Sequence, residues 1–165
     1  MVANPTQAAE IMHRDVPSVS PDLLLSDVRH TLFETNHRSV PVVAGGRLVG
    51  IISRTDLGRV EELMASLDAE VSDAVEWADQ EADGFEHPAP HPFAGFEDRT
   101  KCLRVRDAMR RQVITCAPSA PLAQVADEMV RHHVNQIVVV EKESPVGMVN
   151  SLDLVKLFHD LLVAK

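Results

Sequence analysis

Apolar residues in the first third of the chain recur at two spacings, one typical of helices and one typical of buried strands. Leu25, Val28 and Leu32 are three or four residues apart and predict an amphipathic helix. Two β-branched runs, 40–43 and 48–52, predict a hairpin, and the two glycines in its turn supply positive φ. An extended segment before the first helix and a second helix after the hairpin complete a β-α-β-β-α order.

The same order returns later, because the sequence matches itself without a gap at an offset of 97 residues from about Glu10 to Leu57. The identical pairs include Pro21/Pro118, Leu25/Leu122, Val28/Val125, Val42/Val139, Gly50/Gly147 and Asp56/Asp153. A three-stranded sheet with helices on one face leaves its other face apolar, and a unit of about 48 residues cannot bury that face alone. We therefore predict an α+β fold in which two β-α-β-β-α repeats pack sheet to sheet with pseudo-twofold symmetry.

An offset of 97 residues exceeds what two such units need, so the chain carries an insert. We expect the first repeat at 6–64, the insert at 65–102 and the second repeat at 103–163. Apolar residues at helical spacing predict that the helix after the first hairpin extends to near Trp77. This extension either packs on its own repeat or offers a surface for dimerisation or for a partner protein.

The insert ends in a Pro/Gly/Phe-rich loop at 83–96, which either folds over a cleft or docks a partner. Glu86, His87 and His91 in this loop are potential metal ligands, but intervening prolines disfavour a helical pair of ligands. We therefore expect no metal site. The remaining histidines, including His132 and His133, are interpreted as surface residues.

Composition excludes several classes of function. The net charge of −9 would repel a nucleic acid backbone. No apolar run approaches the roughly 18 residues that cross a bilayer, so we expect a cytoplasmic protein with no membrane contact. Cys102 and Cys116 do not form a Cys-x-x-Cys pair, which leaves no support for a disulfide framework or a structural zinc site.

Two motifs in the repeated frame resemble the CBS domain family, named after cystathionine β-synthase, in its paired form. The first comprises Val40–Val43 and Leu48–Leu57, and the second comprises Ile137–Val140 and Pro145–Leu154. The strand-Gly-strand-x-x-x-Asp-helix pattern is moderately specific alone and strong when duplicated in register. The resemblance implies a regulatory module, often a homodimer with four repeats in a disc, that requires no cofactor. It implies AMP, ADP, ATP or S-adenosylmethionine as the regulatory ligand.

The resemblance also implies a role for each motif residue. Asp56, at the end of the second hairpin strand, would accept hydrogen bonds from the ribose hydroxyls, and a carboxylate suits a cis-diol because it only accepts. Ser53 and Thr55 would contact phosphate, with the N-terminus of the following helix beside them. The second copy keeps Asp153 but has Asn150 and an apolar leucine at the other two positions, so we expect the weaker site there.

Further contacts follow from the same resemblance. Ser18 and Thr115 match family positions that reach the adenine edge. Val40, with Pro41 after it, and Ile137 match positions that wall the base.

Arg38 lies just before the second strand, where a cation could meet phosphate, whereas its counterpart Asn135 carries no charge. A solvated surface side chain is the alternative for Arg38, and strand-surface positions are the alternative for Ser18 and Thr115. Asp56, Asp153, Ser53 and Thr55 could instead serve only as helix caps. Gly50 and Gly147 are expected to allow close packing.

Three functions compete. The first is an adenine-nucleotide sensor whose dimer geometry or partner surface changes on binding. The second is a structural or protein-interaction module with vestigial clefts. An enzyme is the least supported, because the sequence contains no recognisable nucleophile-base pair, phosphate-binding glycine loop or metal cluster.

Overall fold

The structure is a computed structural model that describes residues 5–35, 37–78 and 102–163. The expected loop at 83–96, with Glu86, His87 and His91, lies outside the described residues. In the first half of the chain the elements are α1 (Ala8–Ile11), α2 (Leu25–Glu34), β1 (Ser39–Ala44), β2 (Arg47–Ser53) and α3 (Arg54–Ala78). In the second half they are α5 (Val105–Ala108), β3 (Thr115–Cys116), α6 (Leu122–His132), β4 (Gln136–Glu141), β5 (Ser144–Asn150) and α7 (Ser151–Val163).

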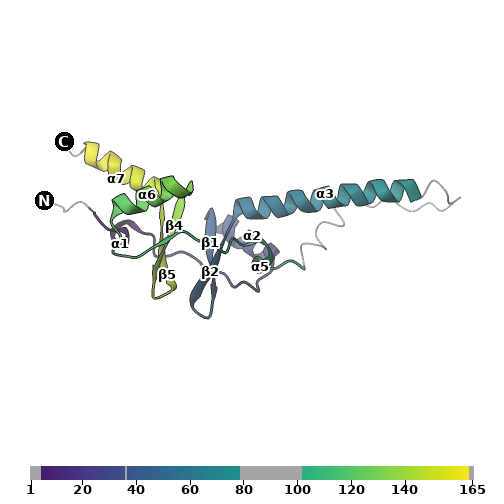
Figure 1. Cartoon of the computed structure of the whole chain (residues 1–165), viewed down its shortest axis with the longest axis horizontal. Coiled ribbons are helices and arrows are strands. Elements are labelled where there is room, and N and C mark those ends of the chain that lie inside the picture. Colours follow the sequence, from purple (N-terminus) through teal and green to yellow (C-terminus); the bar gives the residue numbers. More distant parts are fainter. Residues whose placement is uncertain (1–4, 36, 79–101, 164–165) are drawn as a thin grey trace. The chain divides into compact units, whose positions relative to one another are not determined.

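The α+β class and the repeated order of helices and strands are confirmed (Figure 1). The chain forms two compact units. The strand unit comprises Met1–Pro21, Val40–Ile51 and Arg110–Lys165, and the helix unit comprises Asp22–Ser39 and Ile52–Met109. Each unit therefore combines segments from both halves of the sequence.

The two repeats differ in how their first extended segment pairs. In the second repeat, β3 lies parallel to β4, and β4 pairs antiparallel with β5 in a three-stranded sheet. In the first repeat, β1 and β2 form a two-stranded sheet, and only a single parallel bridge joins Val19 to Val42. The N–H of Val138 donates to the carbonyl of Ile114 at 3.3 Å. Pro41 takes the place of Val138 in the first repeat and has no N–H to donate, so the pairing is shorter there.

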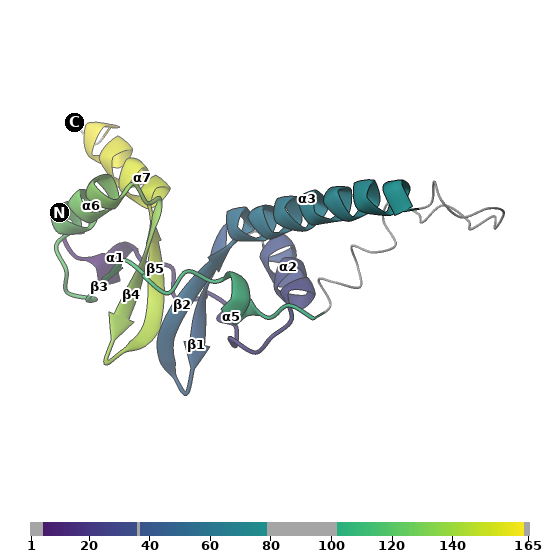
Figure 2. The same ribbon diagram turned by 45° about the vertical axis from the view of Figure 1, so that its right-hand side comes forward.

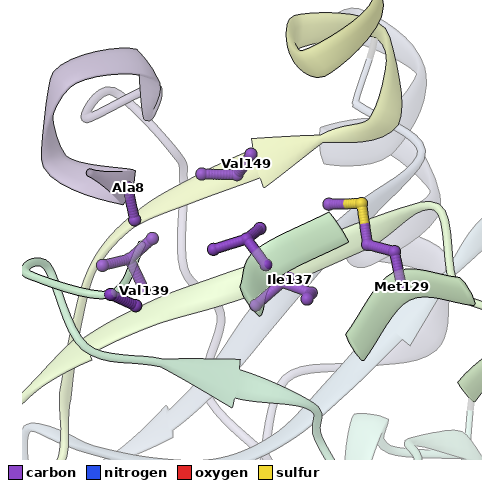
Figure 3. Close-up of a cluster of buried hydrophobic side chains, with 7 residues drawn as sticks. Ala8, Met129, Ile137, Val139 and Val149 are labelled. Carbon is purple, nitrogen blue, oxygen red and sulfur yellow. The ribbon is translucent and has the colours of Figure 1, made fainter. Parts of the chain in front are cut away.

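The core of the second repeat is completed by the N-terminal segment of the chain (Figure 3). Ala8 is fully buried in this cluster, and Ile11 and Met12 pack against it. The members contributed by the second repeat are Ala120, Val125, Met129, Ile137, Val139 and Val149. The N–H of Ala8 also donates to the carbonyl of Ala120 at 2.9 Å. The short helix α1 is thus held by a repeat that lies more than 100 residues away in the sequence.

The first residues of the second repeat behave in the reciprocal way within the helix unit, where they contact elements of the first repeat. The N–H of Leu25 donates to the carbonyl of Leu103, and the N–H of Val105 donates to the carbonyl of Leu23, at 3.0 and 2.9 Å. Helix α5 contacts α3, and its Val105 is fully buried. Figure 2 shows α5 beside α2 and α3.

Both hairpin turns contain two consecutive residues with positive φ, as type I′ turns require. Gly45 and Gly46 fill these positions in the first hairpin, as predicted, whereas the second hairpin uses Lys142 and Glu143. Within the strand unit the two turns contact each other. The N–H of Leu48 donates to the carbonyl of Glu143 at 2.9 Å, and the hydroxyl of Ser144 donates to the carbonyl of Gly46 at 2.6 Å.

Helix α3 runs without interruption through 25 residues, which confirms the predicted extension to near Trp77. It contacts α2 and α5. Leu63 and Leu67 on α3 are 58% and 41% exposed, so these apolar positions are only partly covered within the chain.

Candidate functional site

Each hairpin passes directly into a helix, and the motif aspartate occupies the third residue of that helix. Strand β2 ends at Ser53 where α3 begins, and β5 ends at Asn150 where α7 begins. Asp56 is 4% exposed and Asp153 is 9% exposed. Two carboxylates are therefore buried at helix N-termini, where unpaired backbone N–H groups and the helix dipole favour negative charge.

In the first motif, Asp56 and Ser53 form a capping box. One carboxylate oxygen of Asp56, Oδ2, accepts hydrogen bonds from the backbone N–H and the hydroxyl of Ser53, at 2.9 and 2.5 Å. The backbone N–H of Asp56 in turn donates to Ser53 Oγ at 3.2 Å. The guanidinium of Arg59 lies 3.7 Å from the other oxygen, Oδ1. The capping role left open for both residues thus describes their observed contacts.

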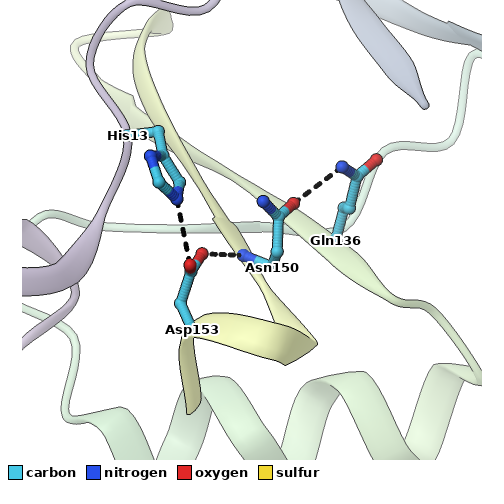
Figure 4. A network of polar contacts seen from close by, with 4 residues as sticks. All are labelled: His13, Gln136, Asn150 and Asp153. Carbon is cyan, nitrogen blue, oxygen red and sulfur yellow. Dashed lines mark hydrogen bonds and ion pairs between the residues drawn. The ribbon is translucent and has the colours of Figure 1, made fainter. Parts of the chain in front are cut away.

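The second motif uses different contacts around its aspartate (Figure 4). Asp153 Oδ2 accepts a hydrogen bond from the backbone N–H of Asn150 at 2.9 Å, whereas Asp153 Oδ1 lies 2.9 Å from His13 Nε2. The side chain of Asn150 does not return to the aspartate, because its Oδ1 accepts a hydrogen bond from Gln136 Nε2 at 2.7 Å. This carboxylate is therefore shared between its own helix and the N-terminal segment.

His13 is the contact that sequence reasoning missed, since the histidines were interpreted as surface residues. Its side chain is 54% exposed, yet its ring reaches a buried carboxylate. The offset of 97 places His13 opposite Arg110, and both residues pair with the second strand of a hairpin, His13 with Met148 and Arg110 with Ile51. A polar residue at the same place in both repeats was the available signal.

The remaining predicted site residues divide into exposed and buried positions. Ser18, Arg38, Thr55 and Thr115 are exposed, which leaves their side chains accessible to a ligand. The carbonyl of Arg38 accepts a hydrogen bond from the N–H of Arg54 at 3.0 Å, which links the start of β1 to the start of α3. The nucleotide contacts assigned to these side chains stay predictions.

Val40, Pro41 and Ile137 are buried. The side chain of Ile137 belongs to the core cluster of the second repeat, so its apolar atoms stabilise that core. The base-wall role assigned to Val40 and Ile137 and the nucleotide contact assigned to Pro41 stay predictions, and for Ile137 that role would fall to the backbone.

The close-packing role expected for Gly147 is confirmed. A Cβ atom built on Gly147 would lie 2.8 Å from the carbonyl oxygen of His13 and 2.8 Å from the sulfur of Met12. Only glycine therefore allows the N-terminal segment to lie against β5 in this way.

One surface feature was not predicted. A hollow of about 370 Å³ is lined by Ser26, Arg29, His30 and Phe33 on α2. The guanidinium of Arg54 lies 4.7 Å from the centroid of the Phe33 ring, within the range of a cation-π contact. None of the predicted nucleotide-binding residues lines this hollow.

Within residues 5–35, 37–78 and 102–163, no group of three histidine, cysteine or acidic side chains is arranged to hold a metal ion. No helix in the same ranges is long and apolar enough to cross a membrane. Cys116 is partly buried, and this burial raises the pKa of its thiol, whereas Cys102 is exposed.

Comparison with known proteins identifies the family. The CBS domain model matches residues 8–62 and 105–160, so the chain belongs to the CBS domain family and contains two CBS domains. The CBS domain of a CBS domain-containing membrane protein from Sphaerobacter thermophilus is 32% identical, with a TM-score of 0.67. That comparison covers 93% of this chain and 88% of the other.

Two further comparisons extend this result. The uncharacterized protein MJ1225 of Methanocaldococcus jannaschii is 30% identical over 146 residues, 88% of this chain and 44% of its own. Its crystal structure superposes with a TM-score of 0.69 at 26% identity, covering 96% of this chain and 49% of the other. The CBS domain pair of protein MJ0100, in complex with 5′-methylthioadenosine and S-adenosyl-L-methionine, has a TM-score of 0.66 at 20% identity. That superposition covers 95% of this chain and 99% of the other, so the two chains share the fold. The chain spans less than half the length of the curated relatives it matches.

Proposed function

We propose that this chain is a regulatory module that binds an adenosine-containing ligand at its CBS motifs and catalyses no reaction. The observation that carries the proposal is the duplicated buried carboxylate at a helix N-terminus, in a chain whose two domains belong to the CBS family. The MJ0100 pair, which shares the fold, binds 5′-methylthioadenosine and S-adenosyl-L-methionine. AMP, ADP, ATP and S-adenosylmethionine are therefore the ligands to test first.

The first motif is proposed as the principal site. Thr55 places an exposed hydroxyl at the start of α3, and Arg38 supplies an exposed cation in the same unit. The second motif has Leu152 and Asn135 at these positions, neither of which complements a phosphate. A phosphate at the first motif would also gain from the N-terminal N–H groups of a 25-residue helix.

Isothermal titration of the full chain with AMP, ADP, ATP and S-adenosylmethionine tests the proposal. We expect at least one ligand to bind more tightly than the millimolar range. If all four bind only in the millimolar range or not at all, the sensor function is wrong for these ligands.

A second candidate, a module for protein interaction, is favoured by an exposed apolar face on α7. The exposed residues of this face are Leu152, Val155, Phe158, Leu161, Leu162 and Val163, and they are 39% to 69% exposed. Exposed apolar surface of this kind often marks an interaction site. We propose that it contributes to a homodimer, which is compatible with ligand sensing in a cytoplasmic protein.

Light scattering at micromolar concentration tests the dimer. We expect a mass near twice 18.2 kDa for the wild-type chain and a mass near 18.2 kDa for Phe158→Glu. The matched control is His159→Glu, which places the same charge on the neighbouring residue. A monomeric mass for the wild-type chain would contradict the proposed dimer. It would not bear on the proposed ligand binding, which the calorimetric titration tests.

A further inference from the structure

The backbone of His13 is held in place without help from its side chain. Its N–H donates to the carbonyl of Met148 at 2.8 Å, and the N–H of Met148 donates to the carbonyl of His13 at 2.9 Å. The absence of a side chain at Gly147 lets this pairing form, because a Cβ there would lie 2.8 Å from the carbonyl oxygen of His13. The imidazole is thus presented to α7 by a fixed β-bridge.

The imidazole and the motif carboxylate differ in their freedom to move. Asp153 is 9% exposed, and its Oδ2 is held by the backbone N–H of Asn150 at the start of α7. The side chain of His13 is 54% exposed and is held to Asp153 Oδ1 by a contact of 2.9 Å. A competing group at Asp153 would therefore displace the imidazole and leave the carboxylate where it is.

A ribose diol would compete for the same oxygen. Two adjacent hydroxyls need two of the roughly four acceptor positions of a carboxylate. The imidazole occupies one position on Oδ1 and the backbone N–H of Asn150 occupies one on Oδ2. The amide oxygen of the neighbouring Asn150 accepts a hydrogen bond from Gln136, so this side chain is turned toward β4. A hydroxyl that donates to Oδ1 therefore competes with the imidazole for that oxygen.

We propose that His13 sets the ligand affinity of the second motif, because its imidazole competes with an adenosine-containing ligand for Oδ1 of Asp153. This inference rests on the proposed function. His13 would thus be a specificity-determining residue. It lies outside the repeated hairpin-helix motif and contacts the second motif from the opposite end of the sequence. The second motif is on this account a site kept at low affinity by an intramolecular contact.

The decisive experiment measures the second motif alone. In the full chain, Asp56→Asn disables the first motif while preserving the size of the side chain, and AMP and S-adenosylmethionine are titrated calorimetrically. We expect His13→Ala in this background to tighten binding about fivefold, the effect of removing one competing hydrogen bond. The control His13→Gln keeps an N–H donor of similar reach and should bind as weakly as the Asp56→Asn parent.

A structural role for His13 would give the opposite sign, because losing a structural contact weakens binding. Two results would overturn the inference in a protein whose wild-type chain binds ligand at its first motif. One is unchanged or weaker binding when His13→Ala is added to the Asp56→Asn chain. The other is no measurable binding in either of these two chains. If the wild-type chain binds none of AMP, ADP, ATP and S-adenosylmethionine, the proposed function is wrong for these ligands, and the inference is overturned with it. A second measurement keeps His13 and so does not depend on the folding of His13→Ala. Ligand should shift the NMR signals of the His13 ring in the Asp56→Asn chain, and unshifted signals at saturation would also overturn the inference.

Discussion

The two helix N-termini that follow the hairpins contain the same carboxylate in different surroundings. In the first, the short hydroxyl side chain of Ser53 returns to Asp56 and closes a capping box. In the second, the longer amide side chain of Asn150 accepts a hydrogen bond from Gln136, and Asp153 contacts the imidazole of His13 instead. The comparison shows that a duplicated motif residue keeps its place in the fold while its polar contacts differ between the repeats.

The largest expected effect separates the two carboxylates. Asp56→Ala should weaken binding of the principal ligand about 100-fold, since two hydrogen bonds from hydroxyls to a charged acceptor are lost. Asp153→Ala should weaken the same binding event much less. Isothermal titration of both variants, with whichever of AMP, ADP, ATP and S-adenosylmethionine binds the wild-type chain most tightly, measures the difference. Equal losses of affinity in the two variants would refute the ranking of the sites.

Substitutions at two glycines test the contact between the N-terminal segment and β5 through the free energy of unfolding. Gly147→Ala should lower the free energy of unfolding by about 2 kcal/mol, because the new methyl group would meet the backbone of His13 and the side chain of Met12. Gly58→Ala is the matched control: a Cβ there meets nothing within 4 Å, and α3 should gain about 1 kcal/mol in helix propensity. Urea denaturation measures both, and a neutral Gly147→Ala would show that the N-terminal segment is not held against β5.

The hairpin turns offer a smaller test with opposite signs. Gly46 has a φ of +80° and Lys142 has a φ of +49°. Gly46→Ala should destabilise by about 1 kcal/mol, and Lys142→Gly should stabilise by a similar amount, because only glycine occupies this region without steric cost. Thermal denaturation should give midpoints that move in opposite directions, and shifts of the same sign would rule out backbone conformation as the cause.

The smallest expected effect concerns α1. Hydrogen bonds from the backbone N–H groups of Thr6 and Gln7 lower the pKa of Glu10. A carboxyl whose pKa is lowered by folding stabilises the protein above its unfolded pKa, and this contribution is lost as the pH falls through the folded value. An NMR titration should show the lowered pKa, and Glu10→Gln should remove this part of the acid dependence. A pKa for Glu10 at or above its ordinary value would contradict the backbone contacts.

Much of the fold could be predicted because its determinants are local. Helical spacing located α2 and α6, β-branched runs located the hairpins, and the double glycine identified the first turn. The second turn carried no such signal, since Lys142 and Glu143 adopt the same conformation without glycine. Contacts between the hairpins inside the strand unit hold that turn, and such contacts leave no local pattern in the sequence.

The site was predictable only in part. Repetition at an offset of 97 residues was enough to find Asp56 and Asp153. Their partners depended on which backbone segments lie beside each helix. Ser53 is three residues from Asp56, so its cap was foreseeable, whereas His13 is 140 residues from Asp153 and was not.

The sequence by itself determined the repeated β-α-β-β-α order, the family and the two carboxylates, because each follows from a local residue pattern and from its return 97 residues later. Only the tertiary structure decided that the first helix of each repeat packs against elements of the other repeat, and that a histidine near the start of the chain contacts the second carboxylate. Pairings of this kind are set by the packing of whole segments against distant strands and helices, and the periodicity of a single segment carries no information about them.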